Sequence, residues 1–296
     1  MILKRAILGL GLVCLAAVSS PAAAADWTRG ANTAYRNMYV PAPRPVPETF
    51  KWYLRADIGL GLQHDLSISE SGLLFGDTAP TEAAAPFGMS SAWFNDDFDT
   101  FFVGGVGVGM YFTPRLRGDI TVDARTATSG DAEATNSYAQ FAGGIATGDT
   151  VRQTIRENVD IRNTVALANL YLDLSQRGSG VTPYIGAGFG FAVRSIDREH
   201  LTTEVIDDGI GGLTPGNTYS GQGKAHQLAP AAAVMAGLAY SVSPGTVIDL
   251  SYRFTWIGSV DMSTRISNGT DTYQSRITVG DNFDHQIRAG LRWNVW

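Results

Sequence analysis

The side chains best suited to acid–base chemistry are the four histidines of the chain, His64, His200, His226 and His285. Paired with a serine such as Ser67 and oriented by a carboxylate, a histidine can activate a nucleophile for acyl transfer. No Ser–His–acid order matches a known local signature, and each histidine lies near the end of a predicted strand or connection. We therefore expect no enzymatic activity and no catalytic residue. A lipid-modifying enzyme that uses His64 and Ser67 is kept as the weakest alternative.

Acidic side chains concentrate in two of the predicted connections between strands. The first connection, Gln63 to Phe98, contains no Lys or Arg, and the third sets Arg198 and Lys224 against its acidic residues. Cation binding that bridges acidic lipopolysaccharide is one interpretation, and a solvated, repulsive surface is the favoured one. The acidic residues are Asp65, Glu70, Asp77, Glu82, Asp96 and Asp97 in the first connection and Asp197, Glu199, Glu204, Asp207 and Asp208 in the third.

Neither a metal site nor a cofactor site is expected from these patterns. The acidic connections lack the ligand spacing of an EF-hand. The glycine runs "GVGVG" and "GAGFG" lie within strand patterns, and no helix follows them to hold a phosphate.

The first 25 residues have the pattern of a secretory signal peptide. Lys4 and Arg5 precede the apolar run Ala6–Val18, and Ala23–Ala25 offers a small-residue cleavage site. An uncleaved N-terminal anchor is the alternative. The single cysteine, Cys14, lies in this segment, so the mature chain is expected to have no thiol.

The charge of the mature chain excludes one class of partner. Removing Lys4 and Arg5 leaves 22 − 2 = 20 basic residues against 28 acidic ones, a net charge of −8. A chain of this charge is not suited to binding nucleic acid through its phosphates. Residues 26–51 include "PAPRPVPE" and are predicted to form an extended linker.

From Trp52 onward, apolar and polar residues alternate with a period of two in eight segments. In each segment one face is apolar and the other carries charged or glycine residues. The sixth segment is alanine-rich and favours a helix by propensity, but Pro230 argues against a helix interior. The predicted strands are Trp52–Leu62, Phe101–Phe112, Leu116–Arg125, Val165–Leu174, Thr182–Ala192, His226–Val242, Val247–Trp256 and Asp284–Trp296.

The connections alternate between short and long. Thr113–Pro114, Ser175–Gly180 and Ser243–Gly245 are tight turns, whereas the other four connections each have roughly 25 to 35 residues, far above a usual hairpin loop. This alternation is typical of an outer-membrane barrel with short periplasmic turns and long extracellular loops. The sequence therefore predicts an all-β, eight-stranded antiparallel transmembrane barrel over residues 52–296, with both termini periplasmic.

The charged face is predicted to line the interior of the barrel. An arginine that faced lipid near the midplane would cost about 2–4 kcal/mol. Facing inward, cations and anions can pair across a narrow bore, in which the inward glycines make room for large side chains. The expected inward set is Arg55, Arg117, Arg125, Arg253, Arg288, Arg292, Asp57, Asp119, Asp123, Asp173 and Asp249.

Two aromatic belts are predicted at the ends of the strands, where lipid interfaces select them. A soluble sandwich or lipocalin-like barrel is the alternative fold, but it explains neither the belts nor the alternation of connections. The belt residues are Trp52, Tyr111, Phe112, Tyr184, Tyr240 and Trp293 at the short-turn ends and Phe101, Phe102, Phe189, Phe191, Phe254 and Trp256 at the long-loop ends.

Four strand motifs, "WYLRADIGLGL", "TPYIGAGFGFA", "VIDLSYRF" and "HQIRAGLRW", resemble those of the opacity protein/Omp25-type surface antigens of Gram-negative bacteria. The resemblance covers the strands of about Trp52 to Trp296 and implies a small outer-membrane barrel. One departure is that family members usually end with an aromatic residue in phase with the lipid face, whereas the in-phase residue here is Val295.

The function expected from these patterns is structural or interactive: a surface antigen, an envelope stabiliser or an adhesin. A narrow passive pore is the main alternative. The segment Val260–Val279 is predicted to form a hairpin with a two-residue turn at Asn268–Gly269, and it either serves adhesion or simply extends the barrel. Expected partners are outer-membrane lipid and lipopolysaccharide, the barrel-assembly machinery, and host or surface ligands of the loops.

Overall fold

The computed structural model of the chain describes residues 51–63, 67–71, 99–142, 145–175 and 180–295. The chain divides into the units Met1–Ala42 and Pro43–Trp296, and every described residue belongs to the second unit. The predicted signal peptide, the linker up to residue 50, and His64 lie outside the described residues, as do most of the first acidic connection and Trp296. No helix in the described residues is long and apolar enough to span a membrane.

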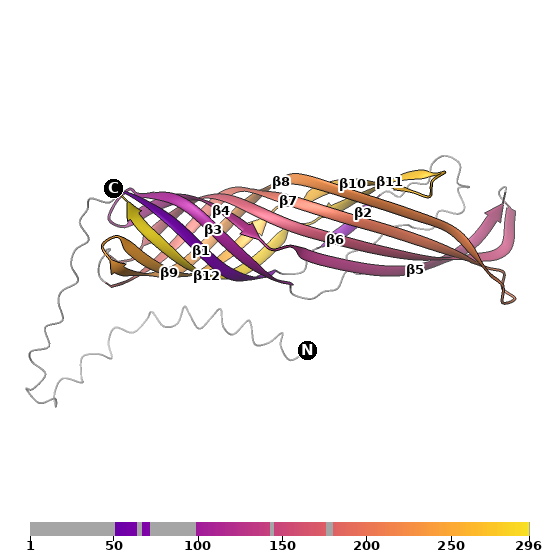
Figure 1. The fold of residues 1–296 in the computed structure, drawn as a ribbon, viewed down its shortest axis with the longest axis horizontal. Helices are drawn as coiled ribbons and strands as arrows, with labels where there is room; N and C mark the ends of the chain where they lie inside the picture. The colour runs from indigo at the N-terminus through magenta and orange to yellow at the C-terminus, as the bar shows by residue number, and fades with distance from the viewer. Residues whose placement is uncertain (1–50, 64–66, 72–98, 143–144, 176–179, 296) are drawn as a thin grey trace, which may run out of the picture. The chain divides into compact units, whose positions relative to one another are not determined.

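The described residues form twelve strands in one antiparallel sheet (Figure 1). In chain order they are β1 (Trp52–Gln63), β2 (Ile68–Ser71), β3 (Asp99–Tyr111), β4 (Leu116–Arg125), β5 (Thr128–Ala142), β6 (Ile145–Asp173), β7 (Val181–Asp207), β8 (Leu213–Ser243), β9 (Thr246–Ile257), β10 (Val260–Ser267), β11 (Thr272–Val279) and β12 (Asn282–Val295).

Eight of these strands close into a ring. Each pairs with the next in the order β1, β3, β4, β6, β7, β8, β9 and β12, and β12 pairs back with β1 over the full length of β1, from Trp52↔Val295 to Gln63↔Asp284. All eight pairings are antiparallel. The prediction of an all-β fold with eight antiparallel strands is therefore confirmed, and the ring is the left half of the ribbon in Figure 1.

Within the described residues, the second, third and fourth long connections consist mainly of strands and not of loops. β6, β7 and β8 have 29, 27 and 31 residues and continue well beyond the ring. The predicted strands Val165–Leu174, Thr182–Ala192 and His226–Val242 are correct in place but much too short. The physical reason is that the backbone of one strand can satisfy its neighbour's hydrogen bonds beyond the ring as well as within it.

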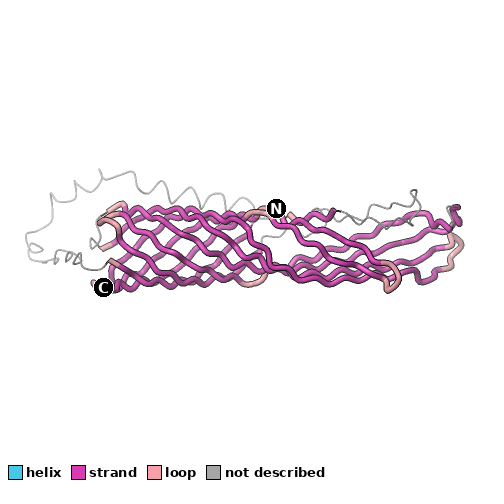
Figure 2. The backbone as a smooth tube through the Cα atoms, turned by 90° about the horizontal axis from the view of Figure 1, so that it is seen from above, coloured by secondary structure: helices cyan, strands magenta, loops and turns pink. Residues whose placement is uncertain are grey.

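The four strands outside the ring join these extensions to form a second part of the sheet, here called the projection (Figure 2). It consists of β2, β5, β10 and β11 together with residues 145–161 of β6, 195–207 of β7 and 213–227 of β8. Its strand order is β2-β11-β10-β8-β7-β6-β5, so β2 and β5 are its two edges.

The predicted hairpin Val260–Val279 is confirmed as β10 and β11, but its turn is longer than expected. Ser267 pairs with Thr272, which leaves four residues between the strands. The side-chain oxygen of Asn268 accepts the backbone N–H groups of Thr270 and Asp271 at 2.9 and 2.6 Å. This side-chain cap favours the wider turn over the two-residue turn that Asn268–Gly269 suggested.

The alanine-rich segment is a strand, as the neighbouring strands required. Pro230 immediately precedes the first β8–β9 pair, Ala231↔Ile257. Its missing N–H therefore falls at the end of that ladder, and its carbonyl still accepts the N–H of Gly258 at 2.9 Å.

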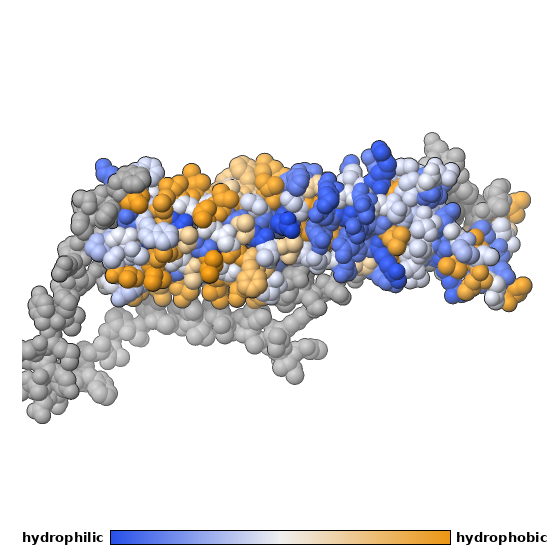
Figure 3. Space-filling model, viewed as in Figure 1, coloured by the Kyte–Doolittle hydropathy of each residue, from blue (hydrophilic) through white to orange (hydrophobic). Residues whose placement is uncertain are grey.

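The two parts of the sheet differ in the polarity of their outer surfaces. On the ring, apolar side chains point outward, with Ile58 72%, Val106 63% and Ile120 62% exposed. In the projection, apolar residues point inward: Ile155 and Val159 of β6 are each 1% exposed. Figure 3 shows apolar side chains gathered over the ring and hydrophilic ones over much of the projection. The ring is thus built for an apolar surrounding and the projection for water.

Three members of the predicted aromatic belts point into the ring instead. Tyr111, Tyr184 and Phe101 are 9%, 3% and 1% exposed. Strand alternation places each of them on the charged face, where Arg117 lies 4.5 Å from the ring centroid of Tyr184 and Arg125 lies 5.0 Å from that of Phe101. The belt prediction is wrong for these three. Trp52, Phe112, Tyr240, Trp293, Phe102, Phe189 and Phe191 are exposed as predicted.

Glycines make room for the interior side chains, as expected. A Cβ at Gly105 of β3 would lie 2.6 Å from a terminal nitrogen of Arg288 and closer still to Asp123. The neighbouring Gly104 points outward, and nothing lies within 4 Å of its Cβ position. The two glycines are therefore a matched pair for testing which face is crowded.

We predict that Gly105→Val destabilises the ring by about 1–3 kcal/mol or prevents its closure, because overpacking forces the charged side chains apart. Gly104→Val, one residue away, should leave stability nearly unchanged. Urea unfolding in detergent and gel mobility without boiling measure both variants. Equal stability of the two variants would contradict the inward assignment.

Candidate functional site

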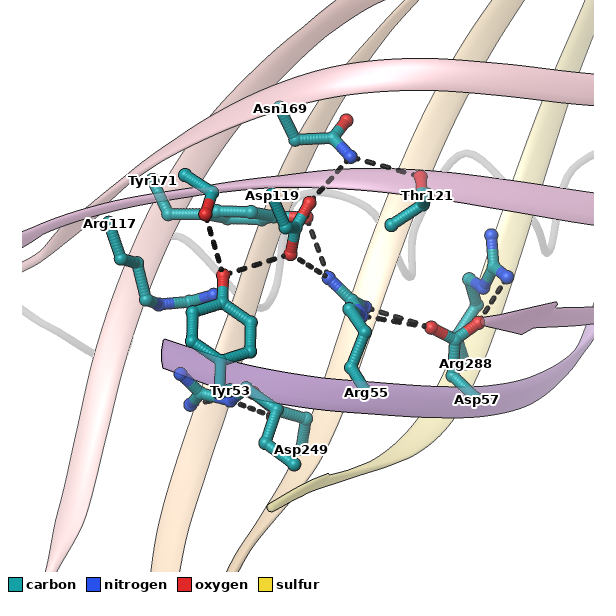
Figure 4. A network of polar contacts seen from close by, with 12 residues as sticks. Tyr53, Arg55, Asp57, Arg117, Asp119, Thr121, Asn169, Tyr171, Asp249 and Arg288 are labelled. Carbon is teal, nitrogen blue, oxygen red and sulfur yellow. Dashed lines mark hydrogen bonds and ion pairs between the residues drawn. The ribbon is translucent and has the colours of Figure 1, made fainter. Parts of the chain in front are cut away.

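The interior of the ring holds a continuous network of paired charges (Figure 4). Arg55 of β1 donates to Asp57 at 3.1 Å, to Asp119 at 3.1 Å and to the hydroxyl of Tyr171 at 2.7 Å. Residue alternation places Arg55 and Asp57 on the same face of β1, so both point into the bore.

A second set of ion pairs connects Asp57 of β1 to side chains on β4, β9 and β12. Arg288 of β12 pairs with Asp57 and with Asp123, the latter at 2.6 Å. Asp123 also accepts from Arg253 of β9 at 2.5 Å. The carboxylates of Asp57 and Asp123 therefore link β1, β4, β9 and β12 across the interior.

The short-turn end of the bore is filled by arginines and tyrosines. Arg117 pairs with Asp173 at 3.2 Å and lies 4.0 Å from the ring centroid of Tyr171. On the other side, Arg292 pairs with Asp249 at 2.7 Å. The tyrosine rings fill the space above the glycines here, since a Cβ at Gly186 would lie 2.5 Å from Tyr171 and one at Gly237 would lie 2.7 Å from Tyr184.

All eleven charged residues that the sequence assigned to the interior are buried there. Their relative exposures lie between 1% and 7%, and each one makes an ion pair. A further inward charge, absent from the predicted set, is Asp284, which is 0% exposed and pairs with Arg125 at 2.5 Å. The alternation of β12 could have revealed it, because Asp284 is two residues before Gln286 on the inward face.

A second charged cluster lies in the projection. Arg198 of β7 donates to Glu157 at 3.0 and 2.5 Å, to Glu70 at 2.8 Å and to the hydroxyl of Ser275 at 2.7 Å. His200 contacts Glu157 through Nδ1 and Thr202 through Nε2. The cluster thus joins β2, β6, β7 and β11. The sequence placed Glu70 among the acidic residues of the first connection but did not indicate that it pairs with Arg198.

This cluster contains metal-type ligands, but an arginine already neutralises them. Glu70, Glu157 and His200 each offer one ligand atom, all within 4.8 Å of one another. A metal ion there would have to displace the guanidinium of Arg198 from both carboxylates. A cavity of about 1010 Å³ adjoins the cluster and is lined by residues of β5, β6, β7, β8 and β10, including Glu157 and His200.

The histidines do not assemble a catalytic triad in the described part of the chain. Nδ1 of His226 lies 2.9 Å from the hydroxyl of Ser195 on the exposed face, a pair that the sequence did not suggest. Within the described residues, no carboxylate is hydrogen-bonded to the second ring nitrogen of His226, so nothing orients it as a base. His285 contacts the hydroxyl of Tyr252 at 2.6 Å. Ser67 uses its carbonyl to accept the N–H of Gly280.

The fold and the interior define an all-β protein with a closed, charge-filled ring. No family model matches the chain. An uncharacterized protein of Brucella abortus is 29% identical over 269 residues, covering 85% of this chain and 87% of its own. A Rickettsia conorii protein named "Putative adhesin" is 24% identical over 247 residues, covering 83% and 82%.

Solved structures that resemble the chain include outer membrane protein OprG from Pseudomonas aeruginosa, with a TM-score of 0.40, 12% identity and coverage of 83% of this chain and 97% of that one. Neisserial surface protein A gives a TM-score of 0.34, 15% identity and coverage of 82% and 97%. Membership in the opacity/Omp25-type family stays a prediction.

We predict that Asp123→Asn destabilises the ring by about 3–5 kcal/mol, because it leaves Arg253 and Arg288 without their shared carboxylate. The matched control is Glu133→Gln, since Glu133 pairs with Arg156 on the surface with both side chains more than half exposed. The control should change stability by at most about 1 kcal/mol. Denaturant unfolding of both variants tests this, and similar losses would contradict the network's role.

Acid should loosen the projection through Glu157. Burial raises the pKa of Glu157, but the hydrogen bonds with His200 and Arg198 and the charge of Arg198 outweigh it, so the pKa lies below 4.5. Its stabilising contribution is therefore present above pH 4.5 and is lost as the pH falls through the lowered pKa. Amide hydrogen exchange of β6 and β7 at decreasing pH measures this loss. Glu157→Gln should flatten the pH dependence, and an unchanged acid profile in this variant would refute the assignment.

Proposed function

We propose that the protein is an outer-membrane β-barrel whose sealed ring anchors the projection outside the cell, where it contacts surface ligands. The observation that carries this proposal is the change in polarity of the outward face along single strands. On β6 the outward face carries exposed Arg152 and Arg156 in the projection and Leu170, 51% exposed, in the ring.

The outward surface of the ring fits lipid. Large apolar side chains are exposed on all eight ring strands, and a contiguous apolar surface of this extent is unsuited to water. The inward arginines would each cost about 2–4 kcal/mol if they faced the bilayer midplane instead. A closed ring also leaves no strand edge with unpaired backbone groups in the hydrocarbon region.

The side on which the projection lies follows from the connections. The turns between β3 and β4 and between β8 and β9 are short, and they lie at the opposite end of the ring from the projection (Figure 1). Outer-membrane barrels place short turns in the periplasm and long connections outside. We therefore assign the projection to the extracellular side and the N-terminal residue Trp52 of β1 to the periplasmic end.

The edge strand β5 supplies a surface for contact. Over its 15 residues, β5 pairs only with β6, and within the described residues its outer edge has no strand partner. Such an edge presents backbone donors and acceptors that an extended segment of another protein can pair with. The name of the Rickettsia conorii relative agrees with a role in adhesion.

The packed interior argues against the narrow pore. Conduction would require water and ions to pass a bore in which arginine, aspartate and tyrosine side chains contact one another from β1 to β12. The expected partners of such a barrel are outer-membrane lipid and lipopolysaccharide, the barrel-assembly machinery, and host or surface ligands.

The test is surface display of the full chain on a non-adherent Gram-negative strain. We predict recovery in the outer-membrane fraction, a mobility shift on boiling, no sustained openings in planar bilayers, and several-fold higher retention of the cells on an epithelial layer. Thr135→Lys on β5 should reduce retention, because a lysine blunts a strand edge.

Thr154→Lys is the matched control, since Thr154 is paired with Thr135 but lies on the interior strand β6. Equal retention with both lysine variants would remove β5 from the proposal. Recovery in the soluble periplasm, or steady conductance, would refute the sealed anchor.

A further inference from the structure

Arg194 of β7 is a buried cation without a counter-charge. It is 0% exposed and lies where the ring meets the projection. One terminal nitrogen donates to the carbonyl of Gly258 at 2.9 Å and to that of Gly280 at 3.0 Å. Its Nε and its other terminal nitrogen have no hydrogen-bond partner.

Arg194 differs in this respect from every other buried arginine of the described chain. The other seven each have a carboxylate oxygen within 4.0 Å. Around Arg194, the charged groups that act on it are Arg125, which repels it, and Asp281, which attracts it without forming an ion pair. Asp281 instead accepts the backbone N–H of Ser259 at 2.9 Å.

Further buried polar atoms without partners lie at the same level. Nε of Arg125 has no partner, and neither does the side-chain oxygen of Asn163. Asn163 is paired with Arg194 in the β6–β7 ladder, and its neighbour Thr164 is paired with Ala124, next to Arg125. The register thus places Asn163 between the two arginines on the inner face.

The unpaired nitrogens of Arg194 and Arg125 call for a negative charge, whereas the oxygen of Asn163 calls for a hydrogen-bond donor. An arginine side chain does not lose its proton in a protein, so Arg194 cannot escape the cost of burial by becoming neutral. A buried charge is tolerated when it is paired and hydrogen-bonded. Unpaired N–H groups on two arginines that repel one another are the donors an anion requires.

We propose that Arg194 and Arg125 hold a small inorganic anion of the halide class. The anion would lie inside the ring, at the end that adjoins the projection. The complete burial of Arg194 restricts the ligand to a small ion and excludes a lipid headgroup. Arg194 also donates to the carbonyls of Gly258, which connects β9 to β10, and of Gly280, which connects β11 to β12. The bound anion therefore stabilises the junction between ring and projection.

The test uses the full chain refolded in detergent, with bromide as the probe. At equal ionic strength, sodium bromide should raise the thermal midpoint by about 3 °C or more relative to sodium gluconate, whose anion is too large for the site. Arg194→Gln keeps an N–H donor for the two carbonyls but removes the charge, so its midpoint should be the same in both salts. Arg156→Gln, on the exposed face of the projection, should respond as the wild type does.

If Arg194→Gln does not fold, the anomalous signal of bromide in wild-type crystals tests the site directly. Crystals of the wild-type protein grown in bromide should show an anomalous peak within hydrogen-bond distance of the Arg194 guanidinium. Absence of that peak, or a bromide response that survives in Arg194→Gln, overturns the proposal.

Discussion

The pairing of arginine with aspartate inside the ring is the interaction on which the rest of the structure depends. The inward charges of the ring are at most 7% exposed, so each must find its partner among the other inward side chains. Asp57, Asp119 and Asp123 each contact more than one cation or hydroxyl, and this sharing connects opposite walls of the ring. The inward glycines are a consequence, because guanidinium groups need the volume that Cβ atoms would occupy.

A second constraint acts along each strand. Alternation assigns successive residues to opposite faces, so the proposed passage of a strand from lipid into water requires its outward face to change polarity. On β6 this change occurs between Arg162 and Leu170, which are both exposed and outward. The place where the ring meets the projection is therefore also the place where the outward surface changes from apolar to polar. Arg194 lies at this boundary, between Ala192 and Ile196 of the buried apolar cluster that runs from the ring into the projection.

The projection is held together differently from the ring. Its interior is an apolar core that includes Ile155, Val159, Ile196, Met262 and Ile277. The cluster of Arg198, Glu157 and Glu70 pins its strands within that core. The strands of the projection are therefore joined by an apolar core with one charged cluster, and those of the ring by an extended network of ion pairs.

Period-two alternation and the cost of charge in lipid were sufficient to determine from the sequence the eight ring strands, their inward charges and the crowding by glycine. These features follow from local spacing, and Arg55 and Asp57 illustrate them. The sequence did not determine the length of β6, the inward turn of Tyr111, or the clustering of Glu70 with Arg198 and Glu157. Those features depend on which strands become neighbours, because a carboxylate 128 residues away is a partner only after the sheet has formed. The isolation of Arg194 was likewise decided by tertiary structure, since a missing partner is visible only once every other charge has been placed.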